Sequence, residues 1–209
     1  MSKAKPVLTA YTGNNNDLFE KIASLYIKDN DRVLDMTFGK GIFWKNIPDI
    51  KCEIWKNDID KNLGTFCYDF RELPEDWKAK FHVVVFDPPY MHSSKYKTIK
   101  KSIDDCYKNN AKISGAGSMN SVRAYYKAGM LEAHRVLASK GILIVKCMDQ
   151  IESSKQRRLH IWVWEDALNV GFMDEDLFVL VQQSVPAMRW QHQIHARKNN
   201  SFFWVFRRN

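Results

Sequence analysis

FHVVVFDPPY, residues 81–90, joins an almost wholly apolar run to an acid, two prolines and a tyrosine. Residues 81–86 are rich in valine, and such β-branched apolar runs are typical of a central strand that is covered on both faces. The strand delivers Asp87 at its carboxyl end. Because the two prolines fix φ and remove two backbone donors, residues 87–90 are expected to form a rigid corner directly after the strand.

Strand-like and helical segments alternate from about residue 17 to residue 180, the pattern of a mostly parallel sheet covered by helices. We expect strands at residues 32–36, 52–57, 65–68, 81–86, 142–147, 177–181 and 201–207. We expect helices from a cap at Asp17 to Ile27, after Gly39 and Gly41, from Val122 to a stop at Gly141, and over Leu159–Val170. The sequence thus predicts a three-layer α/β fold, with the last two strands as an antiparallel hairpin at one edge.

Length and composition limit the class of protein. A chain of 209 residues with 45% hydrophobic and 27% charged residues is most simply one globular domain. A formal charge of +8 favours a polyanionic partner such as nucleic acid, although a merely basic, solvated surface is the alternative. The four cysteines lie far apart without a C-x-x-C pair, so no metal site is expected. No apolar leader or stretch of about 18 apolar residues occurs, which predicts an intracellular, soluble protein without membrane contact.

Acids and glycines follow the first strands at the positions where ligands bind in such sheets. DMTFGKG, residues 35–41, places Asp35 and two glycines on the turn after the first strand, where glycine lets a ligand approach the backbone. Asp58, or its neighbour Asp60, ends the second strand and can hold a ribose diol. Asp69, after the third strand, can accept a hydrogen bond from an adenine amino group. Each acid taken alone is equally well explained as a strand-end cap or a solvated turn.

The DPPY corner suits an amine. The Asp87 carboxylate and the Pro88 carbonyl are acceptors that can both be aimed at one NH2 group. Two acceptors on its hydrogens favour a more tetrahedral nitrogen, whose lone pair can attack a sulfonium methyl group in line. Tyr90 would stack on a base that has left its helix. The alternative is that residues 87–90 form only a rigid turn, in which the Tyr90 ring has a packing role.

In this order, DMTFGKG, NDID, DFREL and FDPPY resemble the motif series of class I methyltransferases, specifically the DNA adenine-N6 and cytosine-N4 amino-methyltransferases. The resemblance runs from about Tyr11 to Arg208 and implies a Rossmann-like, seven-stranded sheet whose last strand, around residues 202–206, is antiparallel. It also implies S-adenosylmethionine as cofactor and the residues Asp87, Pro88, Pro89 and Tyr90 as the amine site. The cofactor-binding residues that it implies are Thr12, Gly13, Asn14, Asp35, Thr37, Phe38, Gly39, Gly41, Asp58, Ile59, Asp69, Phe70 and Asp87.

The chain departs from that family in having no room for a separate target-recognition domain. Sequence specificity must then be low, or come from loops, an accessory partner or another subunit of a homodimer. Basic residues after Tyr90 and near the chain's end are candidates for nucleic-acid contact, with a solvated face as the rival interpretation. They are Lys95, Lys97, Lys100, Lys101, Arg157, Arg158, Arg197 and Lys198, together with Trp190 as a base-stacking residue.

Several targets fit the sequence. Adenine N6 of DNA is the first choice, and cytosine N4 follows because DPPY accommodates either amine. An RNA base amine is the enzymatic rival, since some RNA methyltransferases share the small form and a DPP-aromatic motif. The non-enzymatic rival is a nucleic-acid-binding protein that keeps the fold without turnover.

Overall fold

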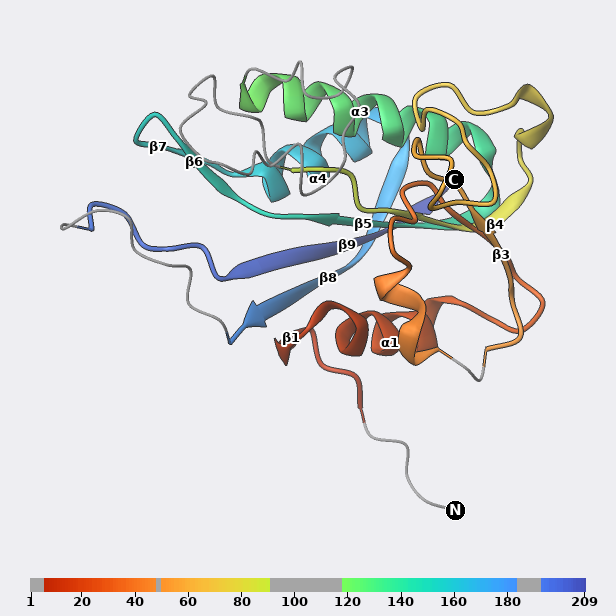
Figure 1. The fold of residues 1–209 in the computed structure, drawn as a ribbon, viewed down its shortest axis with the longest axis horizontal. Coiled ribbons are helices and arrows are strands. Elements are labelled where there is room, and N and C mark those ends of the chain that lie inside the picture. The colour runs from red at the N-terminus through yellow and green to blue at the C-terminus, as the bar shows by residue number, and fades with distance from the viewer. Residues whose placement is uncertain (1–5, 48–49, 91–117, 184–192) are drawn as a thin grey trace.

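A computed structural model describes residues 6–47, 50–90, 118–183 and 193–209, which build a seven-stranded sheet (Figure 1). The strand order is β1-β8-β9-β5-β4-β2-β3. Strand β9 runs antiparallel to both of its neighbours, and every other pairing in this sheet is parallel. The predicted α/β class, the mostly parallel sheet and the antiparallel last strand are confirmed. The strands are β1 (Ala10–Gly13), β2 (Arg32–Asp35), β3 (Glu53–Lys56), β4 (Phe81–Phe86), β5 (Leu137–Cys147), β8 (Phe172–Gln182) and β9 (Asn200–Arg208).

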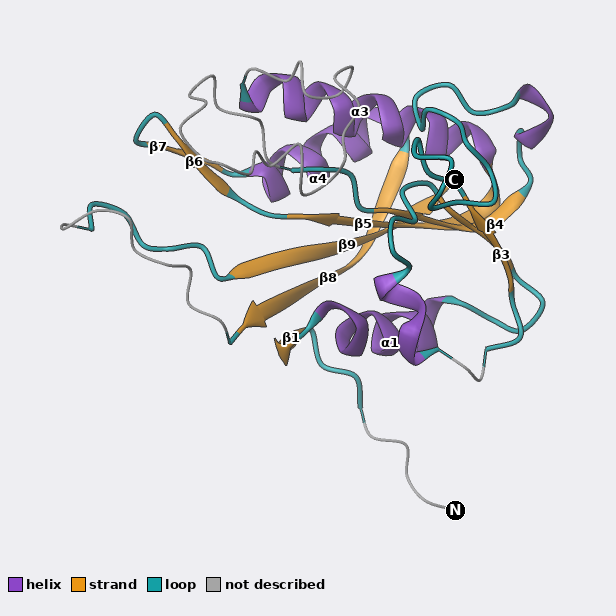
Figure 2. Cartoon of the chain, viewed as in Figure 1, coloured by secondary structure: helices purple, strands orange, loops and turns teal. Residues whose placement is uncertain are grey.

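Helices cover both faces of the sheet and give three layers (Figure 2). Helix α1 (Asn15–Tyr26) lies on one face, and α3 (Met119–Val136) and α4 (Leu159–Val170) lie on the other. Two short 3-10 helices, η1 (Ile42–Asn46) and η2 (Glu75–Trp77), stand in the connections.

Two apolar clusters, one on each face, form the core. Because successive side chains of a strand point to opposite faces, Val83 and Val85 of β4 join the α1 cluster, whereas Val84 and Phe86 join the α3–α4 cluster. All four are at most 1% exposed. The prediction that residues 81–86 form a strand covered on both faces is therefore confirmed.

Several predicted elements differ from those observed, and strands β5 and β8 each start five residues earlier than predicted. Helix α1 is capped by Asn14, whose side-chain oxygen accepts a hydrogen bond from the Asp17 backbone at 3.0 Å, so Asp17 lies in the first turn. After Gly41 the chain forms only the 3-10 helix η1. Helix α3 ends at Val136, and Gly141 lies inside β5. Residues 65–68 contribute a single parallel bridge, Asn57 to Phe66, instead of a strand.

The predicted hairpin of the last two strands exists but does not form an edge. The short strand β1 pairs in parallel with β8 over Ala10–Gly13 and takes the edge position. Sequence reasoning missed β1 because its four residues, AYTG, show neither an apolar run nor a clear alternation.

A second small sheet follows β5. Strands β6 (Gln150–Glu152) and β7 (Lys155–Arg157) form an antiparallel hairpin. Its turn residues, Ser153 and Ser154, have φ of 49° and 61°, as a two-residue turn of type I′ requires. The hairpin extends from the same side of the molecule as the connected ends of β8 and β9, at the left of Figure 1.

Within the described ranges, no helix combines the length and the apolar character that crossing a bilayer requires.

Candidate functional site

The carboxyl ends of the parallel strands β2, β3, β4 and β5 meet at one edge of the sheet. Asp35 ends β2 opposite Val85 of β4, and Phe86 of β4 lies opposite Val145 of β5. The predicted acids Asp35, Asp58 and Asp87 therefore come from neighbouring strand ends. Asp87 and Asp58 both act electrostatically on Asp35.

Asp35 organises the turn after β2. Its carboxylate oxygens accept hydrogen bonds from the Thr37 backbone N–H at 3.1 Å and from the Trp44 indole N–H at 2.7 Å. The residue is only 3% exposed. The pKa of the Asp35 carboxyl is raised to about 7, mainly by burial; the charges of Asp87 and Asp58 contribute to the rise, and the hydrogen bonds from Trp44 and Thr37 oppose it. Asp35 thus stabilises the turn after β2 through these two hydrogen bonds.

The two glycines of this turn both have positive φ but face different surroundings. At Gly39, with φ of 54°, a Cβ atom would meet nothing closer than the Thr37 carbonyl oxygen at 3.8 Å. At Gly41, with φ of 64°, a Cβ atom would lie 2.7 Å from the ring of Phe38. Gly39 therefore borders open space that a ligand can fill, whereas Gly41 serves the packing of the turn itself.

Asp58 joins the end of β3 to the glycine turn. Its Oδ2 accepts a hydrogen bond from the Gly39 backbone N–H at 2.8 Å, and its Oδ1 accepts one from the Asp60 backbone N–H at 2.8 Å. Each carboxylate oxygen has a further lone pair available for a ligand hydroxyl. The oriented carboxylate and the open space at Gly39 form one side of a candidate site that fits a ribose diol.

Asn57, which the sequence analysis did not single out, holds this region together. The residue is fully buried, and its amide N–H groups donate to the carbonyls of Met36 and Tyr68 at 3.1 and 3.0 Å. Its side-chain oxygen accepts from the Tyr68 backbone N–H at 3.0 Å. These side-chain bonds hold Tyr68, and backbone bonds from Thr65 and Phe66 to the Lys56 carbonyl complete the attachment of residues 65–68 to the sheet, where a strand was predicted. The one signal in the sequence was an amide residue directly after the strand EIWK.

The DPPY corner lies against the glycine turn. The backbone N–H of Asp87 donates to the Thr37 hydroxyl oxygen at 2.9 Å. The Asp87 side chain remains 26% exposed, so the corner is not packed shut. This hydrogen bond brings Asp87 next to the turn that carries Thr37 and Gly39. The predicted amine-binding corner and the predicted ligand-binding turn are therefore neighbours.

Lys146, on β5, is a site residue that sequence reasoning missed. Its ammonium nitrogen lies 3.2 and 3.3 Å from the two carboxylate oxygens of Asp87, and its side chain is only 6% exposed. Burial raises the pKa of the Asp87 carboxyl, and the charge and hydrogen bond of Lys146 lower it. The lysine interrupts the apolar run ILIV of residues 142–145, which was its signal.

A buried tyrosine contacts the backbone of the DPPY corner. The hydroxyl of Tyr126, on α3, lies 3.0 Å from the Lys146 carbonyl oxygen and 3.3 Å from the Pro88 carbonyl oxygen. Since a carbonyl oxygen has two lone pairs, Pro88 can accept a second donor as well. Helix α3 thus determines where the predicted amine acceptor lies.

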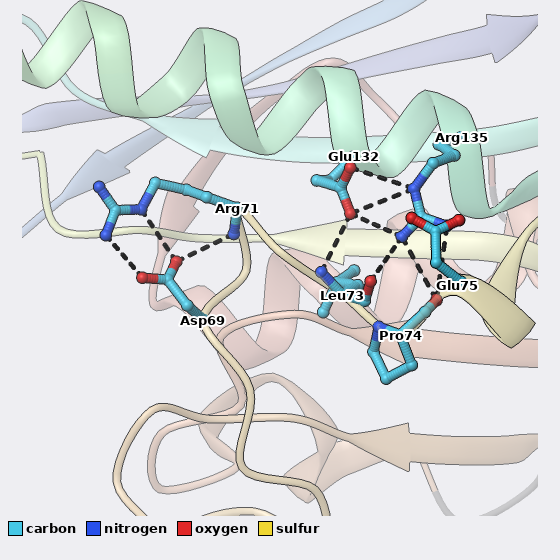
Figure 3. A network of polar contacts seen from close by, with 7 residues as sticks. All are labelled: Asp69, Arg71, Leu73, Pro74, Glu75, Glu132 and Arg135. Atoms are coloured by element: carbon cyan, nitrogen blue, oxygen red, sulfur yellow. Dashed lines mark hydrogen bonds and ion pairs between the residues drawn. The ribbon is translucent and has the colours of Figure 1, made fainter.

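Asp69 and Phe70 are engaged within the protein. Figure 3 shows both Asp69 oxygens bonded to Arg71, with Arg71 Nε at 2.9 Å and Nη2 at 2.6 Å. The Phe70 side chain is 4% exposed, with its ring 5.1 Å from that of Phe86. Phe70 can therefore contact a ligand only through its backbone. Figure 3 also shows the neighbouring ion pair of Glu132 with Arg135, which anchors the loop at Leu73 and Pro74 to α3.

Thr12, Gly13 and Asn14 lie where β1 passes into α1. Because β1 is parallel to β8, its carboxyl end lies at the same edge of the sheet as the other strand ends. Asp17 then accepts from Asn14 Nδ2 at 2.7 Å and from Asn46 Nδ2 at 2.8 Å, which ties this segment to the end of η1. The predicted contact with a cofactor stays a prediction.

The predicted nucleic-acid residues fall into three groups. Arg157 is paired with Glu152 at 2.9 Å, whereas Arg158 and Arg197 are exposed and Lys198 is partly buried. Arg157 ends β7 and Arg158 follows it, whereas Arg197 and Lys198 precede β9; β7 and the start of β9 both lie at the left of Figure 1. Lys95, Lys97, Lys100, Lys101 and Trp190 lie outside the described residues.

In the part of the chain that the structure describes, no three His, Cys, Asp or Glu side chains gather in a way that could hold a metal ion.

The fold is found among solved structures. SpnF, described as a [4+2]-cyclase, matches with a TM-score of 0.58 and 14% identity over 92% of this chain and 81% of its own. TrmN from Thermus thermophilus matches at 0.56 and 15% over 92% of this chain and 48% of its own. A SAM-dependent methyltransferase from Methanosarcina mazei matches at 0.53 and 10%, over 90% of this chain and 96% of its own. The chain has a Rossmann-like methyltransferase fold.

These similarities show the fold alone, and the same fold serves a protein described as a cyclase. This chain spans about half the length of TrmN, and 50% of a further Thermus thermophilus protein that matches with a TM-score of 0.42. No protein-family model matches the chain, and no curated protein is detectably similar in sequence.

Proposed function

We propose that this protein is an S-adenosylmethionine-dependent methyltransferase that modifies an exocyclic amino group of a nucleic-acid base, with adenine N6 of DNA as the first candidate. The observation that carries the proposal is the 2.9 Å hydrogen bond from the Asp87 backbone to the Thr37 hydroxyl. It joins the proposed amine site to the proposed cofactor site.

The residues at the glycine turn fit the cofactor. Gly39 borders open space, and Asp58 presents an oriented carboxylate beside it, as a ribose diol requires. Thr12, Gly13 and Asn14 are the proposed contacts at the methionine end. The Methanosarcina mazei protein, described as a SAM-dependent methyltransferase, supports this choice of cofactor. When bound, S-adenosylmethionine supplies a methyl group activated by a sulfonium centre.

The residues of the corner bind and orient the amine. The ionised Asp87 carboxylate and the Pro88 carbonyl accept its two N–H groups, which directs the nitrogen lone pair away from both. Tyr90 is the proposed stacking surface for the base. Once the nitrogen is alkylated its acidity rises, and Asp87 is the nearest acceptor for the proton. Because the Asp87 side chain is 26% exposed, that proton can pass on to water.

The choice of nucleic acid as substrate is supported by charge. The net charge of +8 attracts a polyanion. The exposed Arg158 and Arg197 precede α4 and β9, which begin on the side of the sheet where β4 and β5 end. Within nucleic acids, DPPY suits adenine N6 and cytosine N4 equally, and DNA stands ahead of RNA only through the sequence resemblance.

Mass spectrometry of nucleosides from DNA and RNA, after incubation with the protein and methyl-labelled cofactor, tests the proposal. We expect labelled N6-methyladenine in DNA. Labelled N4-methylcytosine, or label in RNA alone, would redirect the target but keep the reaction class. Cofactor binding without label in any nucleic acid would contradict the proposed activity and favour a binding protein that retains the fold.

A further inference from the structure

Lys146 is a charged residue in a place where charge is costly. It lies between Val145 and Cys147, both fully buried, and its own side chain is 6% exposed. Strand alternation sends it to the α1 face of the sheet, the face that Ile142 and Ile144 line. A buried ammonium is tolerated only when it is paired and hydrogen-bonded. Its partner should therefore explain why it is there.

The surroundings of the ammonium are defined on several sides. The two Asp87 oxygens lie at 3.2 and 3.3 Å, the Tyr90 ring centroid at 5.3 Å and the Phe43 ring centroid at 5.8 Å. Among the described residues, Asp87 is its only hydrogen-bond acceptor. The pair is also asymmetric, because Asp87 is 26% exposed and Lys146 only 6%. An incoming group therefore reaches the carboxylate, with the lysine behind it.

The backbones on both sides of this pair are fixed independently. The Tyr126 hydroxyl lies within hydrogen-bonding distance of the Lys146 and Pro88 carbonyls, and the Thr37 hydroxyl accepts from the Asp87 N–H. The remaining freedom at the corner is the direction and the charge of the Asp87 carboxylate. Lys146 contacts both of its oxygens, so this lysine controls both properties.

We propose that Lys146 is a positioning residue, which keeps the Asp87 carboxylate ionised and turned toward the target amine. This inference rests on the proposed function and adds to it. A protonated Asp87 would present an O–H donor to an amine that needs acceptors. Burial favours that unwanted proton, and the positive charge and hydrogen bond of Lys146 on β5 oppose it. Asp35, on the adjacent strand β2, is a further acid that interacts electrostatically with Asp87.

The test compares Lys146→Met, which keeps length without charge, with Lys146→Arg, which keeps the charge. Lys127→Met, on the exposed surface of α3, is the matched control. Single-turnover methyl transfer is measured across pH, together with S-adenosylmethionine affinity by calorimetry. We expect Lys146→Met to slow transfer on the order of 100-fold at neutral pH and to move the acidic limb of the profile to higher pH.

The same set of variants separates positioning from a merely structural role. Lys146→Arg should restore much of the rate and the position of the acidic limb, while cofactor affinity stays within about threefold of wild type in every variant. Wild-type transfer by Lys146→Met, or equal loss of transfer and cofactor binding without a pH shift, would overturn the inference. If Lys146→Met does not fold, Lys146→Gln provides the same comparison, since it too removes the charge.

A substrate-free measurement distinguishes this inference from the proposed function. NMR titration of the Asp87 carboxyl should show a higher pKa in Lys146→Met than in wild type. An unchanged pKa would refute the role of Lys146 even in an active enzyme. A raised pKa in a protein that methylates no nucleic acid would refute the proposed activity but leave the pairing of Lys146 with Asp87 supported.

Discussion

Asp35 and Asp87 end adjacent strands, yet their carboxyl groups are held in opposite ways. Asp35 is bound by neutral donors, Trp44 and the Thr37 backbone, and no cation pairs with it among the described residues. Asp87 is bound by the ammonium of Lys146 and remains partly open to solvent. One acid therefore builds the turn, while the other is available to an incoming group.

Asp87→Ala is expected to separate binding from reaction. The substitution removes one of the two proposed amine acceptors, so transfer should fall on the order of 100- to 1,000-fold. Cofactor affinity should hold, because the Gly39–Asp58 hydrogen bond does not involve Asp87. Transfer rates and calorimetry on the same preparation check this, and a parallel loss of both would contradict the assigned role.

Asp35 should make stability depend on pH. Its pKa is raised from 3.8 to about 7 in the folded protein, so between these values the folded state binds more protons than the unfolded state. The free energy of unfolding should therefore fall as pH rises from about 4 to 7, by on the order of a few kcal/mol from this group. Asp35→Asn should remove that dependence, measured as denaturant unfolding at both pH values. A difference between the two proteins that does not change with pH would count against it.

Gly39→Ala and Gly41→Ala form a matched pair. Both glycines have positive φ, so each substitution should cost about 1 kcal/mol of stability through backbone strain. The methyl group at position 39 enters open space and should reduce S-adenosylmethionine affinity at least tenfold. At position 41 it meets the Phe38 ring and should add a further loss of stability. Calorimetry and chemical denaturation test both, and unaltered cofactor affinity in Gly39→Ala would exclude that space as the cofactor site.

At the scale of elements, the helices and strands that have a long, uninterrupted sequence pattern could be predicted. Strand β4 matches residues 81–86, and α4 matches Leu159–Val170 with Gly171 as its left-handed stop. Both depend on local patterning, an apolar run in one and a terminal glycine in the other. Elements that depend on distant partners were not predictable. Strand β1 exists because β8 offers a parallel edge, and residues 65–68 are held by the Asn57 side chain and the Lys56 carbonyl.

The residues of the candidate site fall into the same two groups, those that could be predicted and those that could not. Asp35, Gly39, Asp58 and Asp87 follow predicted strands directly, so their convergence could be inferred from chain order. Trp44, Asn57, Tyr126 and Lys146 reach the site through packing between segments up to 59 positions apart, as Lys146 and Asp87 are. No local pattern encodes such distances.

The β6–β7 hairpin should contribute to nucleic-acid affinity. Glu152 anchors it by accepting from the Met119 N–H of α3 at 2.8 Å and from Arg157, which leaves Lys155 and Arg158 exposed. Replacing both by Gln should lower the slope of log affinity against log salt by about 0.9 for each charge that contacts phosphate. Fluorescence anisotropy across salt concentrations measures this, with Lys127→Gln on α3 as control. A slope equal to wild type would place the contact elsewhere.

At the scale of the whole molecule, a ligand that binds at this sheet edge should stabilise the fold. At S-adenosylmethionine concentrations of about 100 times the dissociation constant, linkage adds about 2.7 kcal/mol. For a chain of this size that corresponds to a rise in Tm of about 5–10 °C. Asp58→Ala should abolish the shift. Scanning calorimetry with and without cofactor decides, and an equal shift in Asp58→Ala would rule out the diol contact.

The reversed direction of β9 has a consequence for how such a protein can diversify. Because β9 returns antiparallel beside β8, their connection starts at Gln182 and finishes at Asn200, at the same edge of the sheet as the strand ends that carry Asp35, Asp58 and Asp87. A helical crossover would instead lead to the opposite edge. We therefore expect changes in the length of this connection to leave the strand registers unaltered. For the proposed methyltransferase, exchanging this connection is expected to change the target preference while the strand-end acids stay as they are.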